Sequence, residues 1–144
     1  MIKIGFACDH AGFDLKEKLK KYLKEKYQFE VIDFGCNSIE SCDYPDYAHL
    51  LAKAVENGTC DTGIGICGSG NGINMTMNKY QKIRAALCWT EKIAILARSH
   101  NDANICSLPA RFICETEAIL IIDAFLNTKF EGERHLQRIN KIAR

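Results

Sequence analysis

The chain has 144 residues, a length that predicts one domain, spanning residues 1–144, with a hydrophobic core of its own. Its 19 basic and 18 acidic residues leave a formal net charge of +1, which disfavours a nucleic-acid or membrane-surface partner. No apolar run reaches the 18 residues of a membrane-spanning helix, and the opening MIKIGFACDH turns polar too early for a secretory signal.

The predicted strands alternate with predicted helices along the whole chain. The first strand, 2–8, precedes a helix over 15–27, in which Leu15, Leu19, Tyr22 and Leu23 recur at helical spacing. The second helix starts near Pro45 and ends before Gly58. The remaining predicted strands are 29–35, 60–67, 82–89 and 104–108. The remaining predicted helices are 71–79, 91–99, 115–127 and a basic one over about 131–143.

This alternation predicts an α/β fold, in which a five-stranded parallel sheet carries helices on both faces. Ligands of such sheets bind beyond the carboxyl ends of the strands. Residues suited to chemistry follow three of the predicted strands. They are Asp9 and His10 after the first strand, Cys67 and Gly68 after the third, and Arg111 after the fifth.

Eight cysteines are present, an even number that would permit disulfides in a small secreted chain. Several lie inside apolar, strand-like runs, where free cysteine behaves as a small hydrophobic residue. The absence of a CxxC pair disfavours a zinc ribbon or a thioredoxin-type site. We therefore expect a reducing, cytoplasmic setting with mostly unreactive thiols.

The stretch GICGSGNG, residues 65–72, places Gly68, Gly70 and Gly72 at alternate positions between a strand and a helix. Successive backbone amides in such a loop form an anion-binding concavity, and the following helix adds its positive end. The loop therefore favours an oxyanion or a phosphate over an ordinary turn. The GxGxxG at 63–68 lies inside the predicted strand and lacks the acidic residue about 20 positions on, which disfavours a dinucleotide site.

Cys67 stands where the third strand meets this loop, and amide dipoles there favour the thiolate. Its position alone fits a buried structural cysteine equally well. His100 is followed by Asn101 in HNDAN; a histidine side chain suits acid–base chemistry, and the asparagine can orient a hydroxyl. Asp9 and His10 form a second acid–base pair.

Arg134 and Arg138 are four residues apart and project from one face of the predicted basic helix. Two guanidinium groups on one face suit a phosphate, although a solvated helix face explains them as well.

Five motifs in order, IGFACDHAGFDLK, DYPDYA, GICGSGNGINMTMNK, HNDAN and GERHLQR, resemble the type B ribose-5-phosphate isomerases, grouped with the bacterial galactose-6-phosphate isomerase subunits. The resemblance covers nearly the whole chain. It implies a Rossmann-like, doubly wound sheet and conversion of D-ribose 5-phosphate to D-ribulose 5-phosphate in the pentose phosphate pathway, without metal or organic cofactor. It also implies a homodimer or tetramer with active sites shared between subunits, and we expect the C-terminal helix, about 131–143, at the subunit interface.

The resemblance assigns Cys67 as the base that abstracts a proton and His100 as the acid/base that opens the sugar ring. Asp9 and Ser69, which keeps the hydroxyl of a common threonine, complete the catalytic set. The substrate-binding set, which combines loop amides, hydroxyl partners and phosphate ligands, is Asp9, His10, Gly68, Ser69, Gly70, Asn71, Gly72, Asn101, Arg111, Arg134 and Arg138. Its phosphate ligands are His10 and the three arginines.

Three residues depart from those common in that family. Asn71 and Asn74 change the contacts beside the loop, and Pro109 replaces a usual glycine before Ala110 and Arg111, which bears on the aim of Arg111. A six-carbon substrate such as allose 6-phosphate or galactose 6-phosphate is the first alternative. A non-catalytic nucleotide- or phosphate-binding module would use the same loop. A thiol-dependent hydrolase would require Cys67 and His100 within hydrogen-bond reach.

Overall fold

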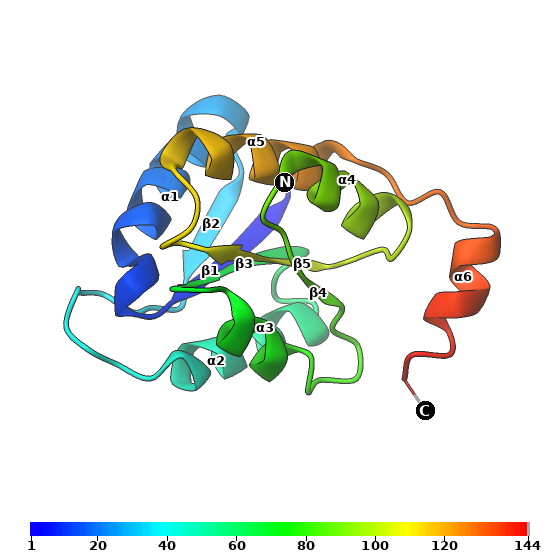
Figure 1. Cartoon of the computed structure of the whole chain (residues 1–144), viewed down its shortest axis with the longest axis horizontal. Helices are drawn as coiled ribbons and strands as arrows, with labels where there is room; N and C mark the ends of the chain where they lie inside the picture. Colours follow the sequence, from blue (N-terminus) through cyan, green and yellow to red (C-terminus); the bar gives the residue numbers. More distant parts are fainter. Residues whose placement is uncertain (144) are drawn as a thin grey trace.

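A computed structural model describes residues 1–143 and shows a five-stranded, all-parallel sheet in the order β2-β1-β3-β5-β4 (Figure 1). This confirms the predicted α/β fold. The strands are β1 Lys3–Cys8, β2 Glu30–Asp33, β3 Thr62–Cys67, β4 Ala85–Leu87 and β5 Ile105–Pro109. The helices are α1 Phe13–Tyr27, α2 Tyr44–Glu56, α3 Asn71–Met77, α4 Glu91–Ser99, α5 Glu115–Asn127 and α6 Arg134–Ile139, with a 3-10 turn at His10–Gly12.

Helices cover both faces of the sheet, with α1, α4 and α5 on one side and α2 and α3 on the other (Figure 1). Alternate residues of β3 supply the two cores. Ile64 and Ile66 pack beneath α1, α4 and α5, whereas Cys67 belongs to the core beneath α2 and α3. Among the helices of residues 1–143, none has the length and hydropathy that crossing a bilayer requires.

Two glycines of β3 are required by close packing against neighbouring helices rather than by ligand binding. A Cβ at Gly63 would lie 2.8 Å from a methyl carbon of Leu51, and one at Gly65 would lie 2.7 Å from Cε of Met77. Both glycines are strand residues on the α2–α3 side. The GxGxxG is therefore part of the sheet, as the sequence predicted.

Two predicted elements are less than half as long as expected, while others, such as the strand predicted at 29–35 and observed at Glu30–Asp33, lose only a few residues. The strand predicted at 82–89 is only Ala85–Leu87, because the amides before it bind side chains instead of a neighbouring strand: Lys82 donates to Glu56 and Arg84 donates to Asn104. The helix predicted at about 131–143 is only Arg134–Ile139. Left-handed backbone at Gly132 and Glu133, with φ of 75° and 52°, prevents an earlier start.

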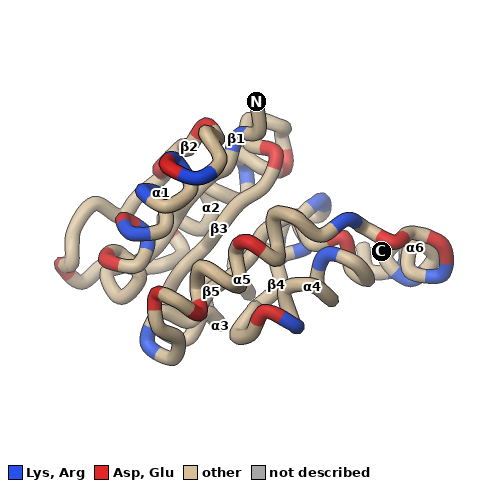
Figure 2. The backbone as a smooth tube through the Cα atoms, turned by 90° about the horizontal axis from the view of Figure 1, so that it is seen from above, with Lys and Arg blue, Asp and Glu red and all other residues tan. Residues whose placement is uncertain are grey.

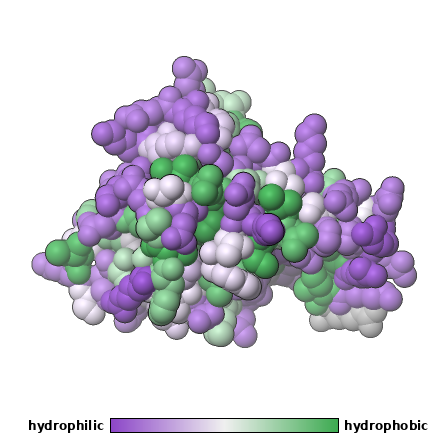
Figure 3. All heavy atoms as spheres, turned by 45° about the horizontal axis from the view of Figure 1, so that its top comes forward, coloured by the Kyte–Doolittle hydropathy of each residue, from purple (hydrophilic) through white to green (hydrophobic). Residues whose placement is uncertain are grey.

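The surface mixes charge and hydropathy. Basic and acidic residues lie close together on α1, whereas the charged residues of α5 are all acidic (Figure 2). The side seen in Figure 3 is mostly hydrophilic, with apolar side chains showing in small patches, as on most globular proteins.

Lys16 is completely buried, and its ammonium ties α1 to the segment that follows β2. Its Nζ donates to Oδ1 of Asp33 at 2.7 Å and to the carbonyl of Cys36 at 2.6 Å, while Lys20 binds the other oxygen of Asp33. Burial opposes ionisation of Asp33, but the two lysines outweigh it and lower the pKa of this carboxyl.

We predict that Asp33→Asn lowers the free energy of unfolding by about 3 kcal/mol at pH 7, because it removes the nearest counter-charge of a buried ammonium and leaves only Glu17 at 3.9 Å. Since the folded pKa of Asp33 lies below the unfolded value, this stabilisation is present above pH of about 4 and is lost as the pH falls further. Urea unfolding between pH 3 and 7 measures both effects. Glu25→Gln, at an exposed carboxylate 4.0 Å from Lys21, is the control and should change stability by less than about 0.5 kcal/mol.

Candidate active site

The strand order creates a crevice between the carboxyl ends of β1 and β3. The chain leaves β1 toward β2 on one side and returns to β3 on the other, so the connections diverge at this point. Doubly wound sheets bind their ligands in this position. Asp9 follows β1 and Cys67 ends β3, so both stand at the crevice.

Asp9 is held rigidly at the crevice. Its Oδ1 accepts hydrogen bonds from the amides of Ala11 at 2.9 Å and Gly12 at 3.3 Å, which caps the 3-10 turn. The side chain is largely buried, yet it lines the cavity described next. Its second carboxylate oxygen is the one left for a ligand.

Cys67 opens into a cavity of about 440 Å³ above the carboxyl edge of the sheet. The cavity brings together six of the predicted site residues and two aromatic residues. Its lining is Asp9, Tyr44, Cys67, Gly68, Ser69, Gly72, Arg111 and Phe112. A thiol, a carboxylate, a hydroxyl and a guanidinium thus share one hollow that is large enough for a small phosphorylated molecule.

The loop after Cys67 offers backbone donors to this cavity. The amide N–H groups of Gly68, Ser69 and Gly70 make no hydrogen bond within residues 1–143, and Asn71 donates to Oγ of Ser69 at 3.3 Å. Gly70 has φ of 76°, and a Cβ there would collide with Leu87 and would lie 3.2 Å from the backbone of Leu108. Only glycine permits this turn, which leaves its amides free for an anionic oxygen.

Arg111 lies directly over the loop. Its backbone amide donates to the carbonyl of Gly68 at 3.0 Å, and its Nη1 lies 3.2 Å from where a Cβ of Gly68 would be. Ala110 donates to the carbonyl of Cys67 at 2.9 Å, so the segment after Pro109 stays fastened to the glycine loop. Pro109 ends β5 beside Cys67 in the sheet.

Tyr44 is a site residue that the sequence reasoning missed. It begins α2, and its ring lies against Gly72 at the start of α3. The motif DYPDYA marked the helix start, but only the packing of α2 against α3 turns this ring into the cavity.

An adjoining cavity of about 400 Å³ shares Ser69 and Phe112 with the first and is otherwise lined by Asn71, Leu87, Trp89 and Pro109. Trp89 and Phe112 are 52% and 75% exposed and form an apolar rim. Asn71 thus lies beside the Cys67 cavity rather than in its lining. His10 also lies outside that lining, with its Nδ1 accepting from the amide of Cys42 at 3.2 Å.

Four predicted site residues lie far from the Cys67 cavity in the folded chain. His100 and Asn101 follow α4 and precede β5, at the amino edge of the sheet, whereas Cys67 is at the carboxyl edge. Strands of this length separate the two edges by roughly 15–20 Å. Asn101 lines a different cavity, of about 780 Å³, and Arg134 and Arg138 are exposed on α6, which Figures 1 and 2 show at the end of the molecule beyond α4.

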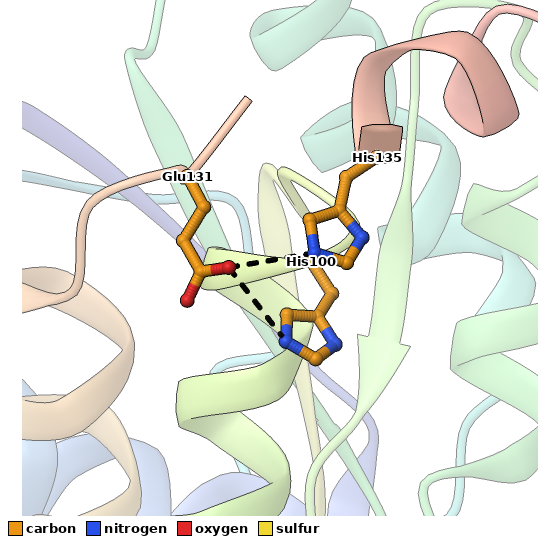
Figure 4. Close-up of side chains that lie close together, drawn as sticks. All are labelled: His100, Glu131 and His135. Carbon is orange, nitrogen blue, oxygen red and sulfur yellow. Dashed lines mark ion pairs between the residues drawn. The ribbon is translucent and has the colours of Figure 1, made fainter. Parts of the chain in front are cut away.

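His100 is part of a second polar cluster, with Glu131 and His135 (Figure 4). The two imidazole rings stack at 4.2 Å with 16° between their planes, and Oε2 of Glu131 lies 3.4 Å from Nε2 of His135 and 4.0 Å from Nε2 of His100. Loss of solvent around His135, helped by the nearby Arg134, lowers the pKa of its imidazole. The sequence reasoning gave His135 no role, because its burial depends on long-range packing.

Each of the eight cysteines, all within the described residues, is free. Burial raises the pKa of Cys8, Cys60 and Cys106, so these thiols are poor nucleophiles, as expected for structural cysteines.

The fold and the cavity define an α/β protein with a pocket suited to a small anionic ligand at the switch point of its sheet. The profile described as Ribose/Galactose Isomerase matches residues 4–142, and the chain belongs to that family. Ribose-5-phosphate isomerase B of Escherichia coli (strain K12) is 45% identical over 142 residues, which cover 99% of this chain and 95% of the relative.

Solved structures agree with this assignment. Ribose-5-phosphate isomerase B of Clostridium thermocellum superposes with a TM-score of 0.97 at 45% identity, covering 99% of this chain and 95% of the other. The enzyme of Mycoplasma genitalium, solved with bound ribulose-5-phosphate, gives a TM-score of 0.93 at 46% identity over 99% and 94% of the two chains.

We predict that Gly70→Ala displaces the loop amides and lowers kcat/KM by about 10²-fold, since misplacement of positioning groups by about 1 Å has effects of that size. Steady-state kinetics and urea unfolding measure the result. Gly58→Ala is the matched control, because Gly58 has a similar φ of 82° but open space around its Cβ position. Gly58→Ala should lower the free energy of unfolding by about 1–2 kcal/mol, the cost of an alanine in left-handed backbone, and should keep its activity. Equal kinetics for the two variants would contradict the prediction.

Proposed function

We propose that the chain is an aldose–ketose isomerase that interconverts D-ribose 5-phosphate and D-ribulose 5-phosphate through an enediolate. The observation that carries this proposal is the cavity in which the thiol of Cys67 adjoins unpaired loop amides and the guanidinium of Arg111. The name of the Escherichia coli relative and the ribulose-5-phosphate bound to the Mycoplasma genitalium relative support a five-carbon substrate.

In the proposed reaction His100 opens the furanose ring by moving a proton between the ring oxygen and the anomeric hydroxyl. Cys67, as the thiolate, then takes the proton from carbon 2 of the open aldose. The electron pair of that C–H bond forms the carbon–carbon double bond, and the carbonyl oxygen on carbon 1 becomes an oxyanion. Return of the proton to carbon 1, with transfer of the hydroxyl proton from O2 to O1, gives the ketose, so atoms and charge balance.

The loop amides stabilise the transition state of this reaction. Gly68, Ser69 and Gly70 present preorganised N–H donors where the enediolate oxygens develop charge, and one such donor is worth about 3–4 kcal/mol. The hydroxyl of Ser69 and the free oxygen of Asp9 contact the sugar hydroxyls. The reaction moves only protons, so this proposal assigns no role to a metal or an organic cofactor.

We further propose that a second copy of the chain completes each site. His100, Asn101, Arg134 and Arg138 lie outside the Cys67 cavity in one chain, yet the mechanism needs an acid/base and phosphate ligands there. A homodimer, or a tetramer built from it, in which the segment 131–143 lies at the subunit interface would bring them in. Arg111 and His10 would then share the phosphate with the partner's arginines, and the eight free thiols suit a cytoplasmic location.

We predict that Cys67→Ala lowers kcat by about 10²–10⁴-fold, the usual contribution of a general base, and leaves binding of ribulose 5-phosphate nearly intact. Ketose formation from ribose 5-phosphate without added metal measures turnover, and ligand-induced thermal stabilisation measures binding. Cys114→Ala, at an exposed thiol before α5, is the control and should keep wild-type rates. Near-full activity of Cys67→Ala would overturn the assignment of the base.

We predict that mixing the two impaired variants Cys67→Ala and His100→Gln restores activity if the sites are shared. Subunit exchange gives half heterodimers, each with one site that has both native residues, so about a quarter of wild-type activity should return. The measurement is the rate after co-refolding an equimolar mixture. A mixture no more active than its components would show that one chain supplies both residues.

A further inference from the structure

Three side chains that could ligate a metal converge where α6 returns to the end of α4 (Figure 4). One ligand atom from each of His100, Glu131 and His135 lies within 4.8 Å of the other two. The 3.4 Å between Oε2 of Glu131 and Nε2 of His135 is close to the spacing of two ligands on a tetrahedral zinc ion with bonds of about 2.0–2.1 Å.

The imidazole of His135 has a buried nitrogen that lacks a partner, which indicates that this cluster can bind a ligand. The residue is 5% exposed, and its Nε2 is buried without a hydrogen-bond partner within residues 1–143. Its distance of 3.4 Å from Glu131 is too long for a good N–H···O bond, although a metal between the two atoms would satisfy both. Buried nitrogens of this kind normally have a partner.

The backbone holds the three residues together. The amide of Glu131 donates to the carbonyl of Ser99 at 3.0 Å, which fastens it beside His100, and the amide of His135 donates to the carbonyl of Gly132 at 3.1 Å. The side chains of Glu131 and His100 are 53% and 38% exposed in the single chain. In the proposed dimer His100 faces the Cys67 cavity of the second copy, through which an ion can enter.

We infer that His100, Glu131 and His135 bind a divalent transition-metal cation, for which Zn²⁺ is the best match. Two imidazoles and one carboxylate form a common zinc ligand set, with a fourth position left for water or an anion. The nearly parallel rings direct their nitrogens side by side, so the more exposed His100 must tilt toward the ion. The positive charges of Arg134 and Arg138 near His135 weaken the binding of a cation, and the negative charge of Glu131 offsets them. We therefore expect a moderate affinity for Zn²⁺.

Such an ion would act as an inhibitor rather than a cofactor. It would occupy Nε2 of His100, the imidazole that opens the sugar ring in the proposed reaction, and would prevent it from moving a proton. This consequence rests on the proposed function, whereas binding of the ion does not.

Zinc titration of the whole protein, followed by the imidazole proton signals in NMR spectra, tests the site. The chain has four histidines, and Zn²⁺ should shift the signals of His100 and His135 while leaving His49, which is bonded to Tyr80 at 2.8 Å, unchanged. Glu131→Gln should weaken binding at least about tenfold, since even outer partners of metal ligands contribute that much. Glu133→Gln removes the same charge from the same exposed segment and should bind Zn²⁺ like the wild type.

Four outcomes decide the inference. Equal zinc affinity in Glu131→Gln and Glu133→Gln would overturn it, as would shifts confined to other histidines. A sulfur-to-metal charge-transfer band with Co²⁺ that Glu131→Gln leaves unchanged would assign the ion to the cysteines and would also overturn it. Binding at the predicted histidines without loss of isomerase activity would confirm the site and contradict the role of His100 in ring opening.

Discussion

The parallel direction of all five strands is the constraint on which the candidate site depends. Because every strand ends at the same edge, Asp9 after β1 and Cys67 at the end of β3 meet without any special loop. The diverging connections of β1 and β3 then leave a crevice between them, and the cavity forms there. The same constraint sends His100 to the other edge, because it precedes a strand instead of ending one.

The cavity is built mostly from backbone and from small residues. Gly68 and Gly72 contribute surface without side chains, which lets Arg111 and Tyr44 lie directly on the loop. Donors that belong to the main chain cannot rotate away, so in the proposed reaction they would remain aimed at the developing oxyanion. Rigidity of the loop, rather than the number of charged groups, is thus the feature that the proposed enediolate mechanism uses.

Much of this arrangement was predictable from the sequence. The helices Glu91–Ser99 and Glu115–Asn127 were predicted with their observed bounds, because capping and apolar spacing are local signals. The strand before Trp89 and the last helix were predicted too long, since side-chain hydrogen bonds to Lys82 and the left-handed backbone at Gly132 depend on tertiary structure.

The site residues divide in the same way. The rule that ligands gather after strand ends found Asp9, Cys67 and Arg111, all of which line the cavity. Tyr44 and His135 were missed because their roles arise from helix packing that no local pattern records. The separation of His100 from Cys67, by contrast, was readable from chain order alone, once the strand that follows His100 is taken into account.

Trp89 gives the molecule a built-in optical reporter. It is the chain's single tryptophan, half exposed, and it lines a hollow together with Ser69 and Asn71 of the glycine loop. Its indole emission therefore responds to whatever changes polarity or water content beside that loop. Filling of the pocket, or coverage of its rim by another molecule, can consequently be followed by intrinsic fluorescence in unlabelled protein.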